Sequence, residues 1–299
     1  MNIAFLFRLN DSFGGAERRL ARVYNEICAE NDDLNCDIVI RGCNLNTALP
    51  CFERADCDIE KFNHIYVFKS RLIENSQRDV NVAFMNECSR ICDRTNIDTN
   101  EVLTAMNTKW NALGFQPGLV GGHCIGEDSY YLLKYAKDIK CDTPVLSHGR
   151  CLNEDMAAYI ADRAVKEMSA VQKDLKRATV LILGITFKEN CSDIRNSKVA
   201  DLIAQLKSYQ INPIVTDECA NPEAVQEMYG IKLVPFDELP LADCIIIAVG
   251  HHAYKTLSMQ HLLNMYKKEL PDHEKVLLDV KSIFDLETLR ASGIRFWRL

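Results

Sequence analysis

Short apolar strands alternate with helices over residues 178–291, and this alternation constrains the fold more than any other feature. Apolar, β-branched runs predict strands at 178–185, 211–217, 244–249 and 276–280. The segments between and after them predict helices near 196–209, 221–229, 257–267 and 285–291. Strands that are apolar on both faces and alternate with helices favour a parallel, doubly wound sheet. We therefore expect an α/β domain over residues 173–299.

The first strand of this domain leads into a polar segment that ends at Asn190. Ligands of doubly wound sheets bind outside the carboxyl ends of the strands. Lys188 and Arg195 follow this strand and are therefore placed to meet a phosphate or a carboxylate. By position alone, each is equally well explained as a solvated surface charge.

The part of the chain before this sheet predicts helices. Residues 72–106 carry apolar side chains at helical spacing, and Asp98 offers an N-cap for a second helix among them. Asn75, Asn86 and Glu87 interrupt the apolar pattern, and polar side chains on a helix are usually solvated. We expect a helical middle domain over residues 71–172.

A long helix is predicted over residues 151–172. One face of it carries Met156, Ile160, Ala164 and Met168. A long helix between two domains often forms a dimer interface. On the pattern alone, an ordinary connecting helix is an equal alternative.

Residues 1–70 predict a small β-α-β unit with strands at 3–7 and 36–41, a helix at 16–29 and a later short strand at 65–68. The glycines before the helix suggest a phosphate-binding loop. The G-x-G-x-x-G fingerprint is absent, however, and Arg41 ends the second strand where a dinucleotide-binding fold places an acid. This unit therefore gives only a weak indication of NAD binding.

Composition excludes several classes of function. The net charge of −7 and the lack of a basic stripe argue against a nucleic-acid partner. No run of about 18 apolar residues predicts a membrane span, and the N-terminus is unlike a signal peptide. The 13 cysteines are scattered, without a CxxC or a compact Cys/His cluster. We expect a cytoplasmic protein with no metal site, whose thiols other than Cys124 are reduced and buried.

Cys124 stands apart because it follows a glycine-rich turn and precedes a predicted amphipathic helix at 130–137. A thiol at or just before a helix N-terminus is favoured as a thiolate by the helix dipole. Asp128 follows four residues later, and the glycines allow a ligand close to the backbone. The stretch predicts a catalytic cysteine in a cleft for phosphate or sugar.

Several long motifs in order carry a resemblance to a known family. They are residues 74–81, 85–87, 108–111, 117–125, 187–190, 192–197 and 279–281. From about residue 72 to Leu299, the chain resembles the UDP-glucose/GDP-mannose dehydrogenase family. It is most similar to the branch that oxidises UDP-N-acetylhexosamines to uronic acids for surface polysaccharides. About 40 residues at the N-terminus resemble instead the opening of family-4 glycosyltransferases, a function that we rank low.

The resemblance implies an NAD-binding Rossmann domain, a helical middle and a C-terminal nucleotide-sugar domain. It also implies that the C6 alcohol of a UDP-sugar is oxidised twice by NAD. Cys124 would attack the intermediate aldehyde and form a thioester on the second oxidation. Asp128 matches a carboxylate that assists water or proton movement, and Asn75 matches an amide that stabilises the oxyanion.

The same resemblance implies a set of binding residues. The turn that contacts the sugar matches Phe115, Pro117, Gly118, Gly121 and Gly122. Lys188 matches a residue that reaches the nucleotide sugar, Arg195 matches one near the cofactor phosphates, and the 151–172 helix matches the family's homodimer helix.

The sequence departs from the family at four places. The short N-terminal β-α-β segment stands where the family has its Rossmann NAD domain, and Arg71 stands where the family has an active-site lysine. Glu127 and Ser129 replace an apolar residue and a proline beside Asp128. We therefore expect a nucleotide-sugar 6-dehydrogenase family member that lacks the NAD domain. The alternative is an inactive nucleotide-sugar-binding or dimerising remnant of a fused or deleted gene.

Overall fold

The computed structural model describes residues 2–8, 35–41, 64–68, 70–122 and 124–299, with side chains from residue 72 onward. It divides into two compact units, Met1–Ser76 and Gln77–Leu299. In the first unit, three strands pair in parallel in the order β1-β2-β3. Their bounds are β1 (Asn2–Arg8), β2 (Asn35–Arg41) and β3 (His64–Phe68). They confirm the three predicted strands, while the predicted helix at 16–29 lies outside the described residues.

Four helices lie between the two sheets in the chain. They are α3 (Ser70–Thr95), α4 (Thr99–Asn107), α5 (Cys124–Asp138) and α6 (Pro144–Ala170). The predicted N-cap is confirmed, because the Asp98 carboxylate accepts the backbone N–H of Glu101 at 2.9 Å. The long helix begins at Pro144, seven residues earlier than predicted, with proline in the position where its missing N–H costs no hydrogen bond.

Several apolar side chains of α3 are exposed, and several polar ones are buried. Its apolar residues Ile73, Phe84 and Ile91 are 42–58% exposed, whereas Asp79 and Asn86 are completely buried. Ala83 and Met85 share the buried face of this helix with polar residues, for which α5 and α6 supply hydrogen-bond partners. The prediction that Asn86 is solvated is therefore wrong.

The second unit contains a five-stranded parallel sheet in the order β5-β4-β6-β7-β8. The strands are β4 (Val180–Leu183), β5 (Ile214–Thr216), β6 (Cys244–Ile247), β7 (Val276–Asp279) and β8 (Arg295–Arg298). The first four confirm the prediction. The fifth was missed because its sequence, Arg-Phe-Trp-Arg, is not an apolar run.

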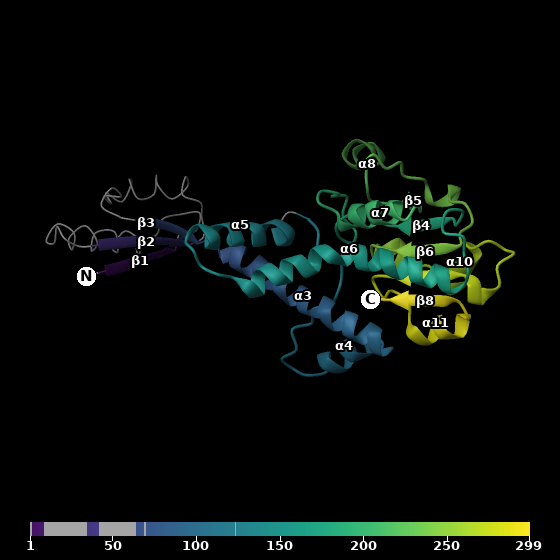
Figure 1. The fold of residues 1–299 in the computed structure, drawn as a ribbon, viewed down its shortest axis with the longest axis horizontal. Helices are drawn as coiled ribbons and strands as arrows, with labels where there is room; N and C mark the ends of the chain where they lie inside the picture. The colour runs from purple at the N-terminus through teal and green to yellow at the C-terminus, as the bar shows by residue number, and fades with distance from the viewer. Residues whose placement is uncertain (1, 9–34, 42–63, 69, 123) are drawn as a thin grey trace. The chain divides into compact units, whose positions relative to one another are not determined.

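Helices cover both faces of this sheet (Figure 1). Side chains of α6, α7 (Lys198–Ser208) and α8 (Pro222–Tyr229) share one core with Val180 and Ile182 of β4. The opposite face carries α9 (His252–Lys255), α10 (Met259–Asn264) and α11 (Leu286–Ser292), and two short 3₁₀ turns lie at Phe236–Glu238 and Asp272–Glu274. Burial on both faces explains the uninterrupted apolar strands.

The apolar face predicted for the long helix is confirmed. Met156, Ile160, Ala164 and Met168 are all fully buried. They belong to the same core as the sheet of this chain, so this face of α6 is occupied within one molecule. The predicted homodimer stays a prediction.

Strand β8 ties the sheet to the helices that precede it. The Trp297 indole donates to Asp93 at 3.0 Å, and the Arg298 guanidinium binds both oxygens of Asp98 at 2.5 and 2.7 Å. Arg295 forms an ion pair with Glu167 of α6 at 2.6 Å. These contacts fix the helices of the second unit against its sheet. Within the described residues, no helix combines the length and apolarity that crossing a bilayer demands.

Candidate functional site

A crevice opens at the carboxyl ends of β4 and β6. It is lined by the segment after β4, by the end of β6 and by the glycine loop before α5. The sheet changes its direction of winding between β4 and β6, because β5 lies on one side of β4 and β6 on the other. This is where doubly wound sheets bind their ligands. Lys188, Lys198 and Lys281 all contribute to the lining.

The glycine loop contacts the segment after β4 so closely that side chains do not fit between them. The N–H of Gly122 donates to the Asn196 carbonyl at 3.1 Å, and the Asn196 amide donates back to the Gly122 carbonyl at 3.0 Å. A Cβ on Gly121 would lie 2.5 Å from the Asn196 carbonyl oxygen, and one on Gly122 would lie 2.7 Å from the Phe187 ring. Gly122 also has a φ of +78°, which glycine adopts without strain. Glycine at both positions is therefore required by close packing.

The loop is held from its other side by α3. The Asn86 side chain accepts the N–H of Gly118 at 2.7 Å and donates to the Gly118 carbonyl at 3.0 Å. The same amide donates to Asn153 of α6 at 2.8 Å. All these side chains are buried, so the bonds are shielded from water. Sequence reasoning missed Asn86, and its place in the matched motif 85–87 was the signal that could have found it.

A buried ion pair continues this network. The Arg150 guanidinium binds the Asp79 carboxylate at 2.6 Å, and neither side chain is more than 1% exposed. Asn153 donates to the same carboxylate at 2.7 Å, and the Ser129 hydroxyl of α5 donates to it at 2.8 Å. The carboxylate thus joins α3, α5 and α6 behind the glycine loop.

The cations of the crevice differ in their partners. Lys198 pairs with Glu154 and Asp201; burial alone would lower its pKa, but these carboxylates raise it. Lys281 lies 3.7 Å from Glu189. The ammonium of Lys188 lies 5.6 Å from the centre of the Phe187 ring. Among the described residues, no carboxylate pairs with Lys188, so its charge is available to an anion.

Glu189 lies beside two lysines at this end of the sheet. It pairs with Lys255 at 3.0 Å as well as with Lys281. Burial alone would raise the pKa of the Glu189 carboxyl, but the two lysines hold it below its ordinary value. Glu189 is therefore a partly exposed anion beside Lys281.

Cys124 is exposed and is the first residue of α5, as predicted. Asp128 lies one turn further along this helix and is half-buried, while Phe115 and Pro117 are half-buried in the loop before it. None of these four residues is among those that line the crevice. Asn75 belongs to the first compact unit, so its predicted place beside Cys124 stays a prediction.

The guanidinium of Arg195 pairs with Asp193, two residues before it in the sequence. Its guanidinium is 58% exposed and binds both oxygens of Asp193 at 2.9 and 2.7 Å. Hydrogen bonding to Asp193 raises the pKa of Arg195. The side chain does not line the crevice.

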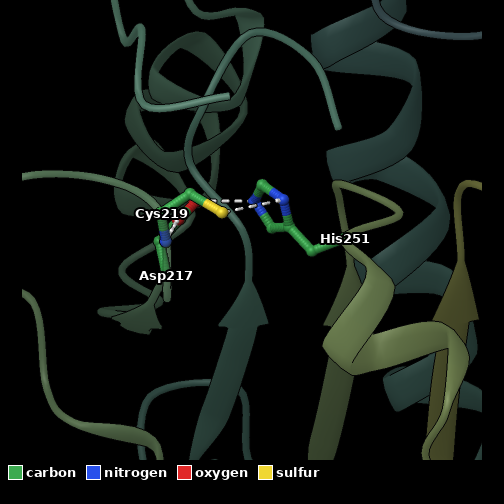
Figure 2. Close-up of side chains that lie close together, drawn as sticks. All are labelled: Asp217, Cys219 and His251. Carbon is green, nitrogen blue, oxygen red and sulfur yellow. Dashed lines mark hydrogen bonds and ion pairs between the residues drawn. The ribbon is translucent and has the colours of Figure 1, made fainter. Parts of the chain in front are cut away.

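The fold also brings together three residues that the sequence did not connect. Asp217, Cys219 and His251 lie close to one another near the carboxyl ends of β5 and β6 (Figure 2). A separation of 32 residues between the cysteine and the histidine gives no signal of metal-ligand spacing. The burial predicted for thiols is wrong for Cys141 and Cys151, which are exposed.

Two family models match the chain. The central domain of the UDP-glucose/GDP-mannose dehydrogenase family matches residues 69–155, and the UDP-binding domain of the same family matches residues 181–286. The chain belongs to this family. These two matches include the glycine loop, Cys124, Lys188 and His251.

Curated relatives carry the same family relationship. Protein CapL of Staphylococcus aureus is 43% identical over 230 residues, which are 77% of this chain and 53% of CapL. A UDP-N-acetyl-D-glucosamine 6-dehydrogenase of Pseudomonas aeruginosa is 41% identical over 216 residues, which are 72% of this chain and 50% of that enzyme. The chain thus spans about half the length of the curated relatives that it matches.

Solved structures show the shared fold. An NDP-N-acetyl-D-galactosaminuronic acid dehydrogenase from Methanosarcina mazei Go1 superposes with a TM-score of 0.68 at 19% identity, over 85% of this chain and 55% of the other. A UDP-D-ManNAc dehydrogenase from Pyrococcus horikoshii gives 0.66 at 20% identity, over 95% and 69% of the two chains. The helical region and the parallel sheet described above are the fold of these proteins.

Proposed function

We propose that the crevice between β4 and β6 binds the diphosphate of a UDP-N-acetylhexosamine. The observation that carries this proposal is the ammonium of Lys188, which lies at the point where the sheet changes its direction of winding. Among the described residues, no carboxylate forms an ion pair with it. The match of residues 181–286 to a UDP-binding domain supports it, as does the name of the Pseudomonas aeruginosa relative.

Binding would use charge and close backbone approach together. Lys188 would donate to a phosphate oxygen, and Lys281 would add a second positive charge from the loop after β7. The glycine loop, with Gly118 and Gly121, would let the sugar lie against the main chain. Phe115 and Pro117 would contact the sugar further along the same loop. These roles follow the family resemblance.

The proposed chemistry centres on the Cys124 thiol. Cys124 is the exposed first residue of α5. The thiolate would attack a C6 aldehyde to give a thiohemiacetal. Asp128 would move the proton or direct the water, and Asn75 would donate to the oxyanion. This is the contribution of the chain to nucleotide-sugar 6-dehydrogenation in polysaccharide synthesis.

The oxidation steps of that reaction require NAD. The one residue predicted to face the cofactor phosphates, Arg195, is occupied by both oxygens of Asp193. A phosphate would therefore have to compete with a bidentate carboxylate. We derive no step through NAD for this reason.

A second candidate function is binding of the nucleotide sugar without turnover. The pairing of Arg195 with Asp193 favours it, and so does Arg71 in the place of the family's lysine. Arginine stays protonated and differs from lysine in shape, so it replaces a catalytic lysine poorly.

The organisation that accompanies this proposal has three parts. They are an N-terminal segment at 1–70, a middle domain at 71–172 and a UDP-sugar domain at 173–299. A homodimer through α6 would use the side of that helix opposite Met156 and Ile160, since these are buried in the core of this chain. A cytoplasmic location belongs to the same proposal.

Calorimetry on the full chain tests the binding proposal. UDP and UDP-N-acetylglucosamine are titrated into the wild type, into Lys188→Met and into Lys176→Met, an exposed lysine remote from the crevice. Loss of a charge-assisted hydrogen bond at Lys188 should weaken binding about tenfold or more. The Lys176 variant should bind like the wild type. No UDP binding by the wild type would refute the proposal.

Turnover separates the two candidate functions. The chain is mixed with UDP-N-acetylglucosamine or UDP-N-acetylgalactosamine and NAD, and NADH is followed by absorbance. Turnover that Cys124→Ala abolishes would establish the dehydrogenase. UDP binding with no turnover would establish the second candidate.

A further inference from the structure

The cluster of Asp217, Cys219 and His251 has the composition of a metal site or of a catalytic triad (Figure 2). The Cys219 sulfur lies 3.6 Å from Nδ1 of His251, and Nε2 of His251 lies 3.1 Å from the Asp217 carboxylate. A catalytic triad requires a free lone pair on Nδ1, which faces the sulfur, and a metal site requires a free lone pair on either ring nitrogen. The hydrogen bonds around the ring decide whether such a lone pair exists.

Nδ1 of His251 is already an acceptor. The backbone N–H of Asn190 donates to it at 2.9 Å, so Nδ1 carries no proton and its lone pair is in use. The proton of the neutral ring therefore lies on Nε2, which faces Asp217 and the Thr186 hydroxyl, each at 3.1 Å. The ring has no exposed surface through which another ligand could approach.

Both oxygens of the Asp217 carboxylate also accept hydrogen bonds from the protein. One oxygen accepts the backbone N–H groups of Ile185 and Thr186 at 2.6 and 3.1 Å, and the other accepts those of Cys219 and Ala220 at 2.8 and 2.9 Å. Burial alone would raise the pKa of Asp217, but the hydrogen bonds from His251 and from the backbone lower it. This carboxylate is therefore an anion whose lone pairs serve the protein's own backbone.

Cys219 lacks the features of an activated thiol. Its burial raises the pKa of the thiol, and so does the negative charge of Asp217 beside it. A reactive cysteine needs the opposite environment, with a lowered pKa and an available base. The base is missing here because Asn190 occupies Nδ1 of the histidine.

Three of these hydrogen bonds end on one segment, residues 185–190. Asp217 binds its first two N–H groups, and His251 binds its last. The Thr186 hydroxyl donates to the Lys188 carbonyl at 3.0 Å, which closes the turn between them. The Asn190 side chain also accepts the N–H of His252 at 2.8 Å. Lys188 thus lies in a segment whose two ends are held by hydrogen bonds.

We propose that Asp217 and His251 are positioning residues that hold the 185–190 segment so that Lys188 meets the ligand phosphate, while Cys219 takes no chemical part. The phosphate in this proposal rests on the proposed function. The hydrogen bonds that hold the segment do not depend on the proposed function, because they are present in the protein without ligand.

Two substitutions of His251 separate its two hydrogen bonds. His251→Asn keeps an oxygen near the place of Nδ1, which can still accept from Asn190. His251→Gln keeps a donor near the place of Nε2 for Asp217 but leaves the Asn190 N–H without its acceptor. Cys219→Ala is the matched control, because it removes the sulfur and leaves both bonds of the histidine.

The first readout is UDP binding by calorimetry on the full chain. We expect about fivefold weaker binding for His251→Gln, about twofold for His251→Asn, and no change for Cys219→Ala. Binding weakened as much by Cys219→Ala as by His251→Gln would overturn the proposal. So would unchanged binding in His251→Gln.

The second readout is amide hydrogen exchange without ligand, which keeps this test independent of the proposed function. Exchange over residues 185–190 should accelerate severalfold in His251→Gln and recover in His251→Asn, while β7 stays protected in both and reports an intact sheet. Unchanged exchange at 185–190 in His251→Gln would refute the fastening, even if the wild type binds no UDP. Stoichiometric binding of zinc alone, lost in Cys219→Ala and His251→Gln alike, would refute it in favour of a metal site.

Discussion

Asn86 holds both polar groups of the Gly118 main chain, accepting its N–H at 2.7 Å and donating to its carbonyl at 3.0 Å. Its amide also reaches Asn153 at 2.8 Å. An asparagine side chain can do both at once because its amide carries a carbonyl oxygen and an NH₂ group. The turn six residues before Cys124 is therefore anchored to α3 by one amide.

Asn86→Ala should destabilise the second unit by about 3 kcal/mol. The substitution leaves a buried N–H, a buried carbonyl and the Asn153 oxygen without partners, and each such group costs about 1–3 kcal/mol. Urea unfolding measures the loss. Asn81→Ala on the same helix is the control and should cost less than about 0.5 kcal/mol. Equal midpoints for the two variants would contradict the role of Asn86.

Gly122→Ala should disrupt the crevice through both strain and a clash. The left-handed backbone costs about 1–2 kcal/mol with a Cβ, and the new methyl would meet the Phe187 ring at 2.7 Å. Gly114→Ala is the matched control, because its φ is +70° and nothing lies within 4 Å of the place that its methyl would occupy. Urea unfolding should show a larger loss for Gly122→Ala than for Gly114→Ala.

A second substitution isolates the clash. Phe187→Ala removes the ring that the Gly122 methyl would meet, so the double variant should lose less stability than the sum of the two single variants. We expect a coupling of about 1 kcal/mol or more. Additive losses would show that only backbone strain matters at Gly122.

The sheet and its helices could be predicted because their signals are local. Each of the first four strands in the second unit is a run of mostly apolar residues, and Asp98 caps a helix three residues before its partner N–H. Strand β8 could not be found in this way. Its charged residues, Arg295 and Arg298, pair with carboxylates far away in the chain, so its signal lies in the tertiary structure.

The candidate site was predicted in part for the same reason. Cys124 and the glycine loop form one continuous stretch, and Lys188 follows a strand end. Asn86 was read as a solvated residue because its partners, Gly118 and Asn153, lie 32 and 67 residues away. The hydrogen-bond partners of an asparagine cannot be identified from a single sequence, so nothing in the sequence predicts that it is buried.

Asp98→Asn should lower stability at neutral pH and lose this effect in acid. Burial alone would raise the pKa of Asp98, but hydrogen bonds from Arg298 and the Glu101 amide hold it below its ordinary value. A lowered pKa stabilises the folded state above the unfolded-state value of about 3.9, and this contribution is lost as the pH falls through the lower folded-state value. We expect a loss of about 2 kcal/mol at pH 7 and a shrinking difference below about pH 4.

Asp285→Asn is the control for this pH dependence. Asp285 caps α11 as Asp98 caps α4, but it is an exposed cap without a bidentate arginine. Hydrogen bonding from the Thr288 backbone also lowers the pKa of Asp285, but asparagine is as good an N-cap as aspartate, so Asp285→Asn should change stability less than Asp98→Asn at either pH. A pH-independent loss in Asp98→Asn would show that the Arg298 pair contributes nothing.

Ser129 lies within α5, five residues after Cys124. A helix that begins at Cys124 uses the Ser129 N–H in its hydrogen-bond ladder, and the buried hydroxyl donates to Asp79 at 2.8 Å. Ser129→Ala removes only the hydroxyl and should cost about 1 kcal/mol. Ser129→Pro also removes the N–H and places its ring against the preceding turn, which costs about 3 kcal/mol or more in a helix interior.

The proline variant should therefore move the helix start beyond Cys124 and remove the thiol from the helix terminus. Modification by iodoacetamide, followed by mass spectrometry of the Cys124 peptide, reports on the thiolate. Ser129→Ala should react at the wild-type rate and Ser129→Pro several times more slowly. Cys151, exposed on α6, serves as the internal reference and should react equally in all three proteins. Equal rates at Cys124 would mean that the start of α5 does not activate this thiol.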